Sequence, residues 1–437
     1  MAHLTTALFI IEFFLIVLIL FYTLLKKGVT FKVGISFGVL FFVFIPVWVM
    51  IFTGSLELSK ADFSYTTISD IILKKSVSGS FLLITFLFSI ILYLYFPSRF
   101  ASLEINQKFK PSIKTYFIIY LIGMAIVFIG SGLLEGGNWY QNRHHFFESS
   151  GAFAVLVAFI INSAKVLIIS SLVYKWINDE LGFFKFLFLV IAFTFWDMFF
   201  SGNRIYLFCT AIIIGLILLK RFPKKTLIAF PFLFPTTFFL GYFASIFRHM
   251  RGPLFLNGLP TFEVFIAALN RAMLLEPPNP KSFFIGISES VNVNVIYDLF
   301  NRYDEFLLGA TYLKPLFFYV PRSIWEAKPE SITVITANFL GGSSLVSTII
   351  GEMYMNFSIL GIIILPIVLW FTEGVITKYL RPYGSISSIV GFFFGILFFR
   401  MPFSDEFLVF VFLILILTFF NIFKKYKFKL PLNHEKN

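Results

Sequence analysis

The sequence predicts an all-α polytopic membrane protein with about eleven transmembrane helices and a large extracytoplasmic loop that contains short helices. Of the 437 residues, 58% are hydrophobic and only 13% are charged. A soluble domain of this length cannot bury so much apolar surface. The apolar residues also fall into runs of about 17–25 residues, the length that a helix needs to cross the hydrocarbon of a bilayer. We expect one integral membrane domain over residues 1–437.

The apolar runs place the expected spans in order along the chain. They begin near Leu4, Val33, Ser80, Thr115, Ala152, Phe186, Ile205, Thr226, Glu352, Ser385 and Asp405. The sixth and seventh spans are short, and only Ser201-Gly202-Asn203 separates them. No small-residue cleavage pattern follows the first run, so we expect no cleaved signal peptide.

Basic residues beside the spans predict the orientation. More than half of the 35 lysines and arginines lie in short segments on one face. These are Lys26, Lys27, Lys32, Arg99, Lys108, Lys110, Lys114, Lys175, Lys185, Lys220, Arg221, Lys224, Lys225, Lys378, Arg381, Lys424, Lys425, Lys427, Lys429 and Lys436. The positive-inside rule makes this face cytoplasmic, with the amino terminus outside and the carboxyl terminus inside. The net charge of +12 then reflects topology, and we expect no nucleic-acid partner.

The longest loop on the other face covers residues 245–351 and predicts a folded extracytoplasmic cap. It carries eight basic and eight acidic residues, so its translocation does not conflict with the charge rule. Phe262–Leu275 and Val291–Tyr303 have the spaced apolar residues of short interfacial helices. The prolines at 277, 278 and 280 break the chain between them.

Motifs for nucleotide or metallopeptidase chemistry are absent from the sequence. No GxGxxG, Walker A or HExxH pattern occurs, which argues against cytosolic nucleotide chemistry. The lone Cys209 cannot form an intramolecular disulfide, and no Cys/His group has zinc-ligand spacing. We expect no metal and no cofactor.

Arginines on the outer face are the strongest pointer to function, because the positive-inside rule would place them in the cytosol. They are Arg143, Arg204, Arg248, Arg251 and Arg322. A guanidinium group stays charged and binds phosphate oxygens in bidentate fashion, which suits a diphosphate headgroup on a membrane lipid. The alternative is that each arginine pairs locally or contacts ordinary phospholipid headgroups.

Four ionisable residues lie within or at the edge of expected spans: Glu12, Lys165, Asp197 and Glu373. Such residues are costly in hydrocarbon and usually face the interior of a helix bundle. Asp197 and Arg204 should lie near the outer ends of adjacent spans, where they can form an ion pair. For Glu12 and Lys165 the alternative is a structural polar contact between helices.

A family resemblance rests on residues in and beside the cap. The stretch from Val320 to Gly361 contains Pro321-Arg322-Ser323-Ile324-Trp325, Lys328-Pro329, Gly351-Glu352, Tyr354, Asn356 and Gly361. Two further arginine-bearing sites are the Gly202-Asn203-Arg204 turn and the loop from Tyr140 to Arg143. In these segments, about a quarter of the chain, the sequence resembles the Wzy-type O-antigen and capsule polymerases. Where the family pattern ends in Asn-Phe-Gly, this chain has Asn356-Phe357-Ser358.

The resemblance implies a glycosyltransferase of the GT-C type at the outer face of the bacterial cytoplasmic membrane. Its donor would be a growing glycan on undecaprenyl diphosphate, and its acceptor a single repeat unit on the same carrier. Its other partners would be membrane lipids, a chain-length regulator and a flippase.

Each candidate residue has an expected role in this chemistry. Glu352 is the expected base for the acceptor hydroxyl, and Arg204 and Arg322 stabilise the charge of the leaving diphosphate. The expected substrate-binding residues are Arg143, Arg248, Arg251, Lys328, Tyr140, His144 and Tyr354. For Glu352 the alternative is a carboxylate that only stabilises the start of a helix. For the tyrosines the alternative is an interfacial aromatic belt.

Two other functions remain open at the level of sequence. An O-antigen ligase, or another lipid-linked glycosyltransferase, shares the donor and differs in the acceptor. A lipid-linked oligosaccharide flippase should show two comparable halves and short loops. One late loop of about 100 residues fits a flippase poorly.

Overall fold

The computed structural model is helical throughout the residues that it describes, with no strand among them. The described residues are 2–48, 77–97, 112–132, 142, 146, 151–201, 205–226, 228, 242–243, 246–247, 249–250, 252–255, 261–275, 291–318, 320, 324–326, 328–340 and 346–425. The all-α class predicted from the sequence is confirmed for this part of the chain.

Long apolar helices occupy most of the predicted spans. They are α1 (Ala2–Lys27), α2 (Phe31–Val39, extended by η1, Leu40–Phe44), α5 (Val77–Tyr95), α6 (Ile113–Gly130), α8 (Gly151–Ile177), α9 (Phe183–Ser201), α10 (Ile205–Arg221), α18 (Gly361–Leu380), α19 (Ser385–Leu397) and α20 (Phe403–Lys425). Six segments of the described chain are long and apolar enough to cross a membrane. The run predicted from Thr226 lies almost entirely outside the described residues. The total of eleven spans therefore remains a prediction.

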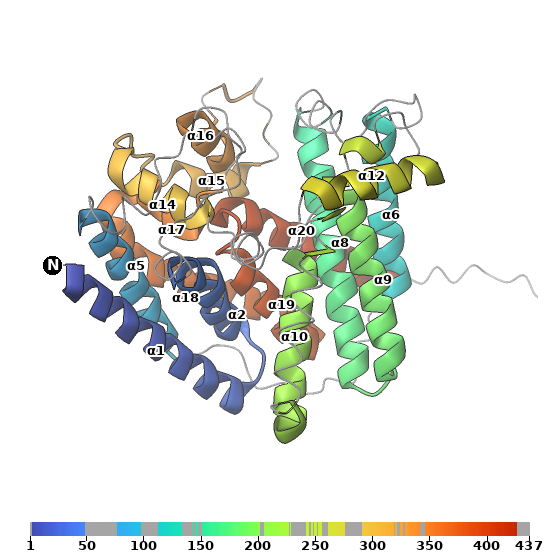
Figure 1. Ribbon diagram of the computed structural model, residues 1–437, viewed down its shortest axis with the longest axis horizontal. Coiled ribbons are helices and arrows are strands. Elements are labelled where there is room, and N and C mark those ends of the chain that lie inside the picture. The colour runs from blue at the N-terminus through green and yellow to red at the C-terminus, as the bar shows by residue number, and fades with distance from the viewer. Residues whose placement is uncertain are drawn as a thin grey trace, which may run out of the picture.

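Shorter helices form the segment predicted as a cap. The two predicted helices there are confirmed as α12 (Phe262–Leu275) and α14 (Val291–Arg302). They are joined by α15 (Ala310–Phe317) and α16 (Ile332–Phe339). In Figure 1 all four lie toward the upper edge of the molecule, and α12 crosses the ends of α6, α8 and α9. Ala268 and Ala272 of α12 are buried there, against partly buried phenylalanines of α6 and α9.

The opposite end of the molecule holds segments that were predicted to be cytoplasmic. The turn between α8 and α9 and the last turn of α10 lie at the lower edge of Figure 1. Arg221 of α10 and Asp179 of the α8–α9 turn form an ion pair with an N···O distance of 3.2 Å. Two predicted cytoplasmic segments thus meet at the end away from α12.

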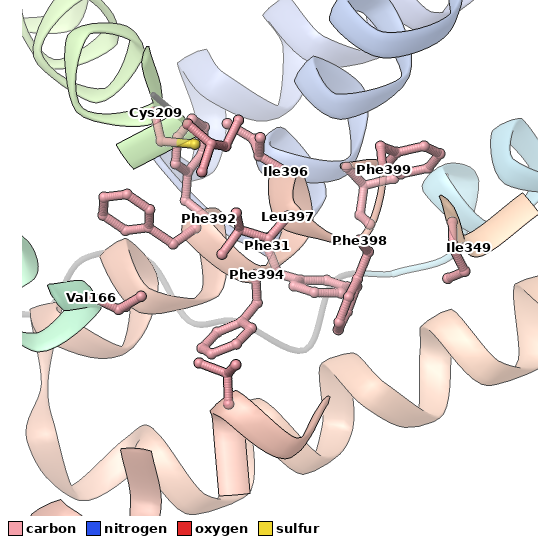
Figure 2. Close-up of a cluster of buried hydrophobic side chains, with 14 of the residues drawn as sticks. Phe31, Val166, Cys209, Ile349, Phe392, Phe394, Ile396, Leu397, Phe398 and Phe399 are labelled. Atoms are coloured by element: carbon pink, nitrogen blue, oxygen red, sulfur yellow. The ribbon is translucent and has the colours of Figure 1, made fainter. Parts of the chain in front are cut away.

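The hydrophobic core is densest where α2 and α19 cross. A Cβ atom on Gly34 of α2 would lie 2.3 Å from the carbonyl oxygen of Phe392 in α19, so these backbones touch directly. Figure 2 shows Phe31 of α2 at this crossing, with Val166, Cys209 and Ile349 around it from three other helices. All four are fully buried or nearly so. The lone cysteine is a packing residue of this core.

Lys32 corrects part of the predicted topology, because it is not a loop residue. It lies in α2, is 2% exposed, and donates from Nζ to the carbonyl oxygens of Tyr93, Leu94 and Phe96 at the end of α5. The hydroxyl group of Tyr93 donates to Glu373 Oε2 at 2.9 Å. Glu373 was expected to face a bundle interior, and it is fully buried between α5 and α18.

Candidate functional site

The Glu352 carboxylate is the centre of a buried polar cluster. It lies in α17 (Thr348–Phe357), a helix of 10 residues, and is 0% exposed. Its Oε1 accepts a hydrogen bond from Thr311 Oγ1 at 2.8 Å, and its Oε2 accepts one from the backbone N–H of Ser404 at 3.2 Å. Three elements therefore position one carboxylate: α17, the start of α15 and the start of α20.

Asn356 orients the threonine that faces this carboxylate. Its Nδ2 donates to Thr311 Oγ1 and to the Glu352 carbonyl oxygen, both at 2.8 Å. The Thr311 hydroxyl accepts from Asn356 and therefore has its proton free to donate to Glu352. This directional chain fixes the carboxylate in one rotamer, as a catalytic group requires.

Strained backbone surrounds the same helix. Of the four described non-glycine residues with positive φ, three border this site: Leu308 (φ 49°), Thr348 (φ 57°) and Ser358 (φ 52°). A positive φ is a genuine outlier for a β-branched residue such as Thr348. Such conformations cost about 1–3 kcal/mol each and gather at active sites and ligand clamps. Their concentration around α17 points to function there.

Several buried polar atoms near Glu352 lack a hydrogen-bond partner among the described residues. They are Tyr312 OH, Ser347 Oγ, Thr348 Oγ1 and Glu406 Oε2. Burial and the neighbouring Glu352 carboxylate raise the pKa of Tyr312 well above its usual range, so its hydroxyl stays protonated. Unsatisfied buried groups require an explanation, and a polar ligand or water is a common one.

Asp405 holds the cap against the start of α20. Its Oδ1 lies 2.5 Å from Lys314 Nζ of α15, and its Oδ2 accepts from Thr333 Oγ1 of α16 at 2.8 Å. Ser331 also donates to this carboxylate. Because Asp405 adjoins Ser404, these contacts fix α15 and α16 beside the site.

Only some of the predicted site residues lie in the described part of the chain. Arg143, Arg204, Arg248, Arg251, Arg322, Tyr140 and His144 lie outside the described residues. Their roles remain predictions.

Three predicted residues can be placed. Glu352 is central, but it is the fifth residue of α17 and not the start of a helix, so dipole stabilisation at a helix start does not explain it. Lys328 donates from Nζ to the carbonyl oxygens of Phe318 (2.9 Å) and Val320 (2.8 Å) beyond α15. The Tyr354 hydroxyl donates to the Phe300 carbonyl oxygen at 3.3 Å, which directs this ring toward α14.

The span that was expected to begin at Glu352 is not one continuous helix. α17 ends at Phe357, and Ser358–Leu360 form a 3-10 turn before α18 begins at Gly361. Ser358 has a positive φ, which glycine adopts without strain. The break separates the short helix that carries Glu352 from the long helix that follows.

Among the described residues the ion-pair partner of Asp197 is Lys165, a pairing that was not expected from the sequence. The distance from Lys165 Nζ to Asp197 Oδ1 is 2.7 Å. Spacing along the chain gave no signal for this pair, because the two residues lie on separate helices. Thr311 and Ser404 were missed for the same reason: neither is remarkable in sequence, and both gain their role by reaching Glu352.

Comparisons with protein-family models, with curated proteins and with solved structures find no match for this chain. Among the described residues, no group of three His, Cys, Asp or Glu side chains is placed to hold a metal ion.

Proposed function

We propose that this protein is a glycosyltransferase that polymerises undecaprenyl-diphosphate-linked oligosaccharide repeat units. It would work at the outer face of the bacterial cytoplasmic membrane and build an O-antigen or capsule-like polysaccharide. The observation that carries the proposal is the buried Glu352 carboxylate, oriented by Thr311 and bordered by strained backbone.

In this reaction Glu352 accepts the proton of the acceptor sugar's hydroxyl group. The hydroxyl oxygen forms a bond to the anomeric carbon of the donor glycan, and the bond from that carbon to the diphosphate oxygen breaks. A base held within hydrogen-bond reach of its proton contributes about 10²–10⁴-fold to rate. The unpartnered hydroxyls of Tyr312, Ser347 and Thr348 suit the binding of a polyhydroxylated acceptor.

The leaving diphosphate needs positive charge, which we assign to Arg204 and Arg322, supported by Arg143 and Arg248. Preorganised donors aimed at developing charge are commonly the largest catalytic contribution. The proposal includes about eleven spans in a GT-C-like arrangement, with residues 245–351 outside the membrane. The packing of α12 across one end of the bundle, away from the α8–α9 turn and Arg221 of α10, supports that arrangement.

The decisive test is reconstitution of the full-length protein in liposomes with a lipid-linked repeat unit. The parent protein should produce a ladder of lengthening glycans. Glu352→Gln should remain folded, because it keeps the size of the side chain and an oxygen that can still accept from Thr311, yet it should lose about 10²-fold or more of the rate. Glu305→Gln, which alters an exposed cap residue, is the matched control and should keep the ladder.

Two outcomes would reject the proposal. Equal glycan ladders from Glu352→Gln and Glu305→Gln would show that the Glu352 carboxylate does not take part in the reaction. A single transfer to a different acceptor, with no ladder, would favour a ligase.

Orientation is tested by labelling intact cells with a membrane-impermeant maleimide. Cys209 is fully buried and should not react in the parent protein. Glu305→Cys should be labelled from outside and Lys224→Cys should not. The reverse pattern would place the cap in the cytosol and exclude chemistry at the outer face.

A further inference from the structure

A second buried ionic cluster lies away from Glu352, between α6, α8, α9 and α10. Lys165 and Asp197 form an ion pair with an N···O distance of 2.7 Å, and each side chain is 2% exposed. The Tyr120 hydroxyl donates to the same carboxylate oxygen, Oδ1, at 3.0 Å. Lys165 Nζ also lies 5.3 Å from the centre of the Tyr206 ring.

This pair keeps unused hydrogen-bonding capacity. Asp197 Oδ2 is buried and has no hydrogen-bond partner among the described residues. A purely structural ion pair is stable in a low-dielectric interior only when its remaining lone pairs are satisfied. An intramembrane carboxylate with a vacant oxygen and a lysine partner instead has the composition of a proton-transfer site.

The cluster lies near the start of α20, whose Ser404 N–H binds the Glu352 carboxylate. The Tyr206 hydroxyl lies within electrostatic range of both Asp197 and Glu406. α20 packs against α8 beside Lys165, since Ser163 Oγ donates to the Val409 carbonyl oxygen at 2.8 Å. Glu406 follows Ser404, whose N–H binds the Glu352 carboxylate, by two residues.

Burial makes a route for protons necessary if Glu352 acts as a base. Glu352 is 0% exposed and Glu406 is 4% exposed, so neither can release a proton directly to water. Asp197 lies about one turn from Ser201, the last residue of α9, and Tyr206 lies in the first turn of α10.

We propose that Lys165 and Asp197 form a proton-exchange site and that Tyr206 and Glu406 connect it to Glu352. The proton on Lys165 Nζ passes to Asp197 Oδ1, which converts the ion pair into a neutral amine and a carboxylic acid. Tyr206 accepts a proton on its oxygen as it gives up its own, so it carries protons between Glu406 and the pair. The connection to Glu352 rests on the proposed function, whereas the exchange at Asp197 does not.

Within the part of the chain that the structure describes, the titratable side chains that face this cluster come from five helices. They are Tyr120 of α6, Lys165 of α8, Asp197 of α9, Tyr206 and Cys209 of α10, and Glu406 of α20.

Infrared difference spectroscopy during pH steps tests the exchange site without any substrate. The purified full-length protein should show a protonated-carboxyl band that titrates, that shifts in deuterated water, and that is lost in Asp197→Asn. Superimposable spectra of the parent and Asp197→Asn would overturn the proposal. The result is independent of whether a glycan ladder forms, so it separates this inference from the proposed function.

A double substitution separates proton transfer from a structural role. Lys165→Met with Asp197→Leu removes both charges, and replacing a buried ion pair by apolar residues is often neutral for stability. The relay predicts a folded protein whose rate of glycan transfer falls by about 10²-fold or more. Full activity in this variant would show that the pair is only structural. If the double variant does not fold, the Asp197→Asn spectrum decides alone.

The control is a second Lys–acid pair, at the end of the helix that carries Lys165. Lys175 of α8 and Glu180 of the α8–α9 turn lie 4.0 Å apart, with exposed fractions of 32% and 45%. The double variant Lys175→Met with Glu180→Leu should leave both the spectrum and the transfer rate unchanged. A loss of rate equal to that of the buried pair would trace the effect to α8 as a whole and contradict the relay.

Discussion

Replacing Gly34 by alanine should weaken the contact between α2 and α19, on which the core depends. A Cβ atom at Gly34 would lie 2.3 Å from the Phe392 carbonyl oxygen, and one at Gly395 would lie 2.4 Å from the Phe31 carbonyl oxygen. Both obstacles are backbone atoms, which cannot rotate away. An ordinary contact begins at 3.4 Å, so the two helices must separate by about 1 Å.

The expected cost follows from that displacement. Overpacking of a well-packed core costs about 1–3 kcal/mol. Alanine also favours a helix over glycine by up to about 1 kcal/mol, which acts in the opposite direction. Gly215→Ala in α10 isolates the propensity effect, because no atom lies within 4 Å of its added Cβ. Gly34→Ala should therefore be less stable than Gly215→Ala by about 1–3 kcal/mol.

The assay is thermal unfolding of the detergent-solubilised protein, followed by size-exclusion chromatography with fluorescence detection after heating. Gly34→Ala and Gly395→Ala should each lower the apparent Tm, and Gly215→Ala should leave it unchanged or raise it. Combining Gly34→Ala with Gly395→Ala should cost less than the two separate effects together, because the first substitution already parts the helices. Equal melting of Gly34→Ala and Gly215→Ala would refute a direct backbone contact.

Three further predictions concern single side chains. Ser358→Gly should raise stability by about 1 kcal/mol in the same thermal assay, because it relieves the positive φ at the end of α17; an unchanged or lower Tm would contradict strain there. Asp405→Asn should loosen the cap, because it removes the charge that binds Lys314. Hydrogen exchange over residues 328–340 should accelerate, and unchanged protection would show that Asp405 does not hold this segment in place. Lys32→Met should lower the stability by about 1.5–3 kcal/mol, because the carbonyl groups at the end of α5 lose a charged hydrogen-bond donor. Circular dichroism on heating measures this loss, and an unaltered melting curve would show that Lys32 does not stabilise the end of α5.

Periodicity and composition predicted the helical elements well. The boundaries expected for α12 agree with the structure, and α14 ends one residue before the predicted limit. Both helices have spaced apolar residues and flanking breakers, which are local features of the sequence. Most long helices also begin close to the predicted starts, because a run of apolar residues has no stable alternative in a bilayer.

The interruption after Glu352 could not be predicted from hydropathy. The apolar character continues from α17 through α18, so hydropathy indicates one span. The helix ends before Ser358, which has a positive φ.

Sequence alone determined that this protein is helical, that several of its helices can cross a membrane, and that Glu352 merits attention. Only the tertiary structure decided which groups act on one another: Thr311 and Ser404 on Glu352, and Lys165 on Asp197. A hydrophobic span consists of consecutive apolar residues, so a short window of sequence is enough to predict it. The partners of a buried charge come from helices far apart in the chain, and their identity is set only when those helices pack.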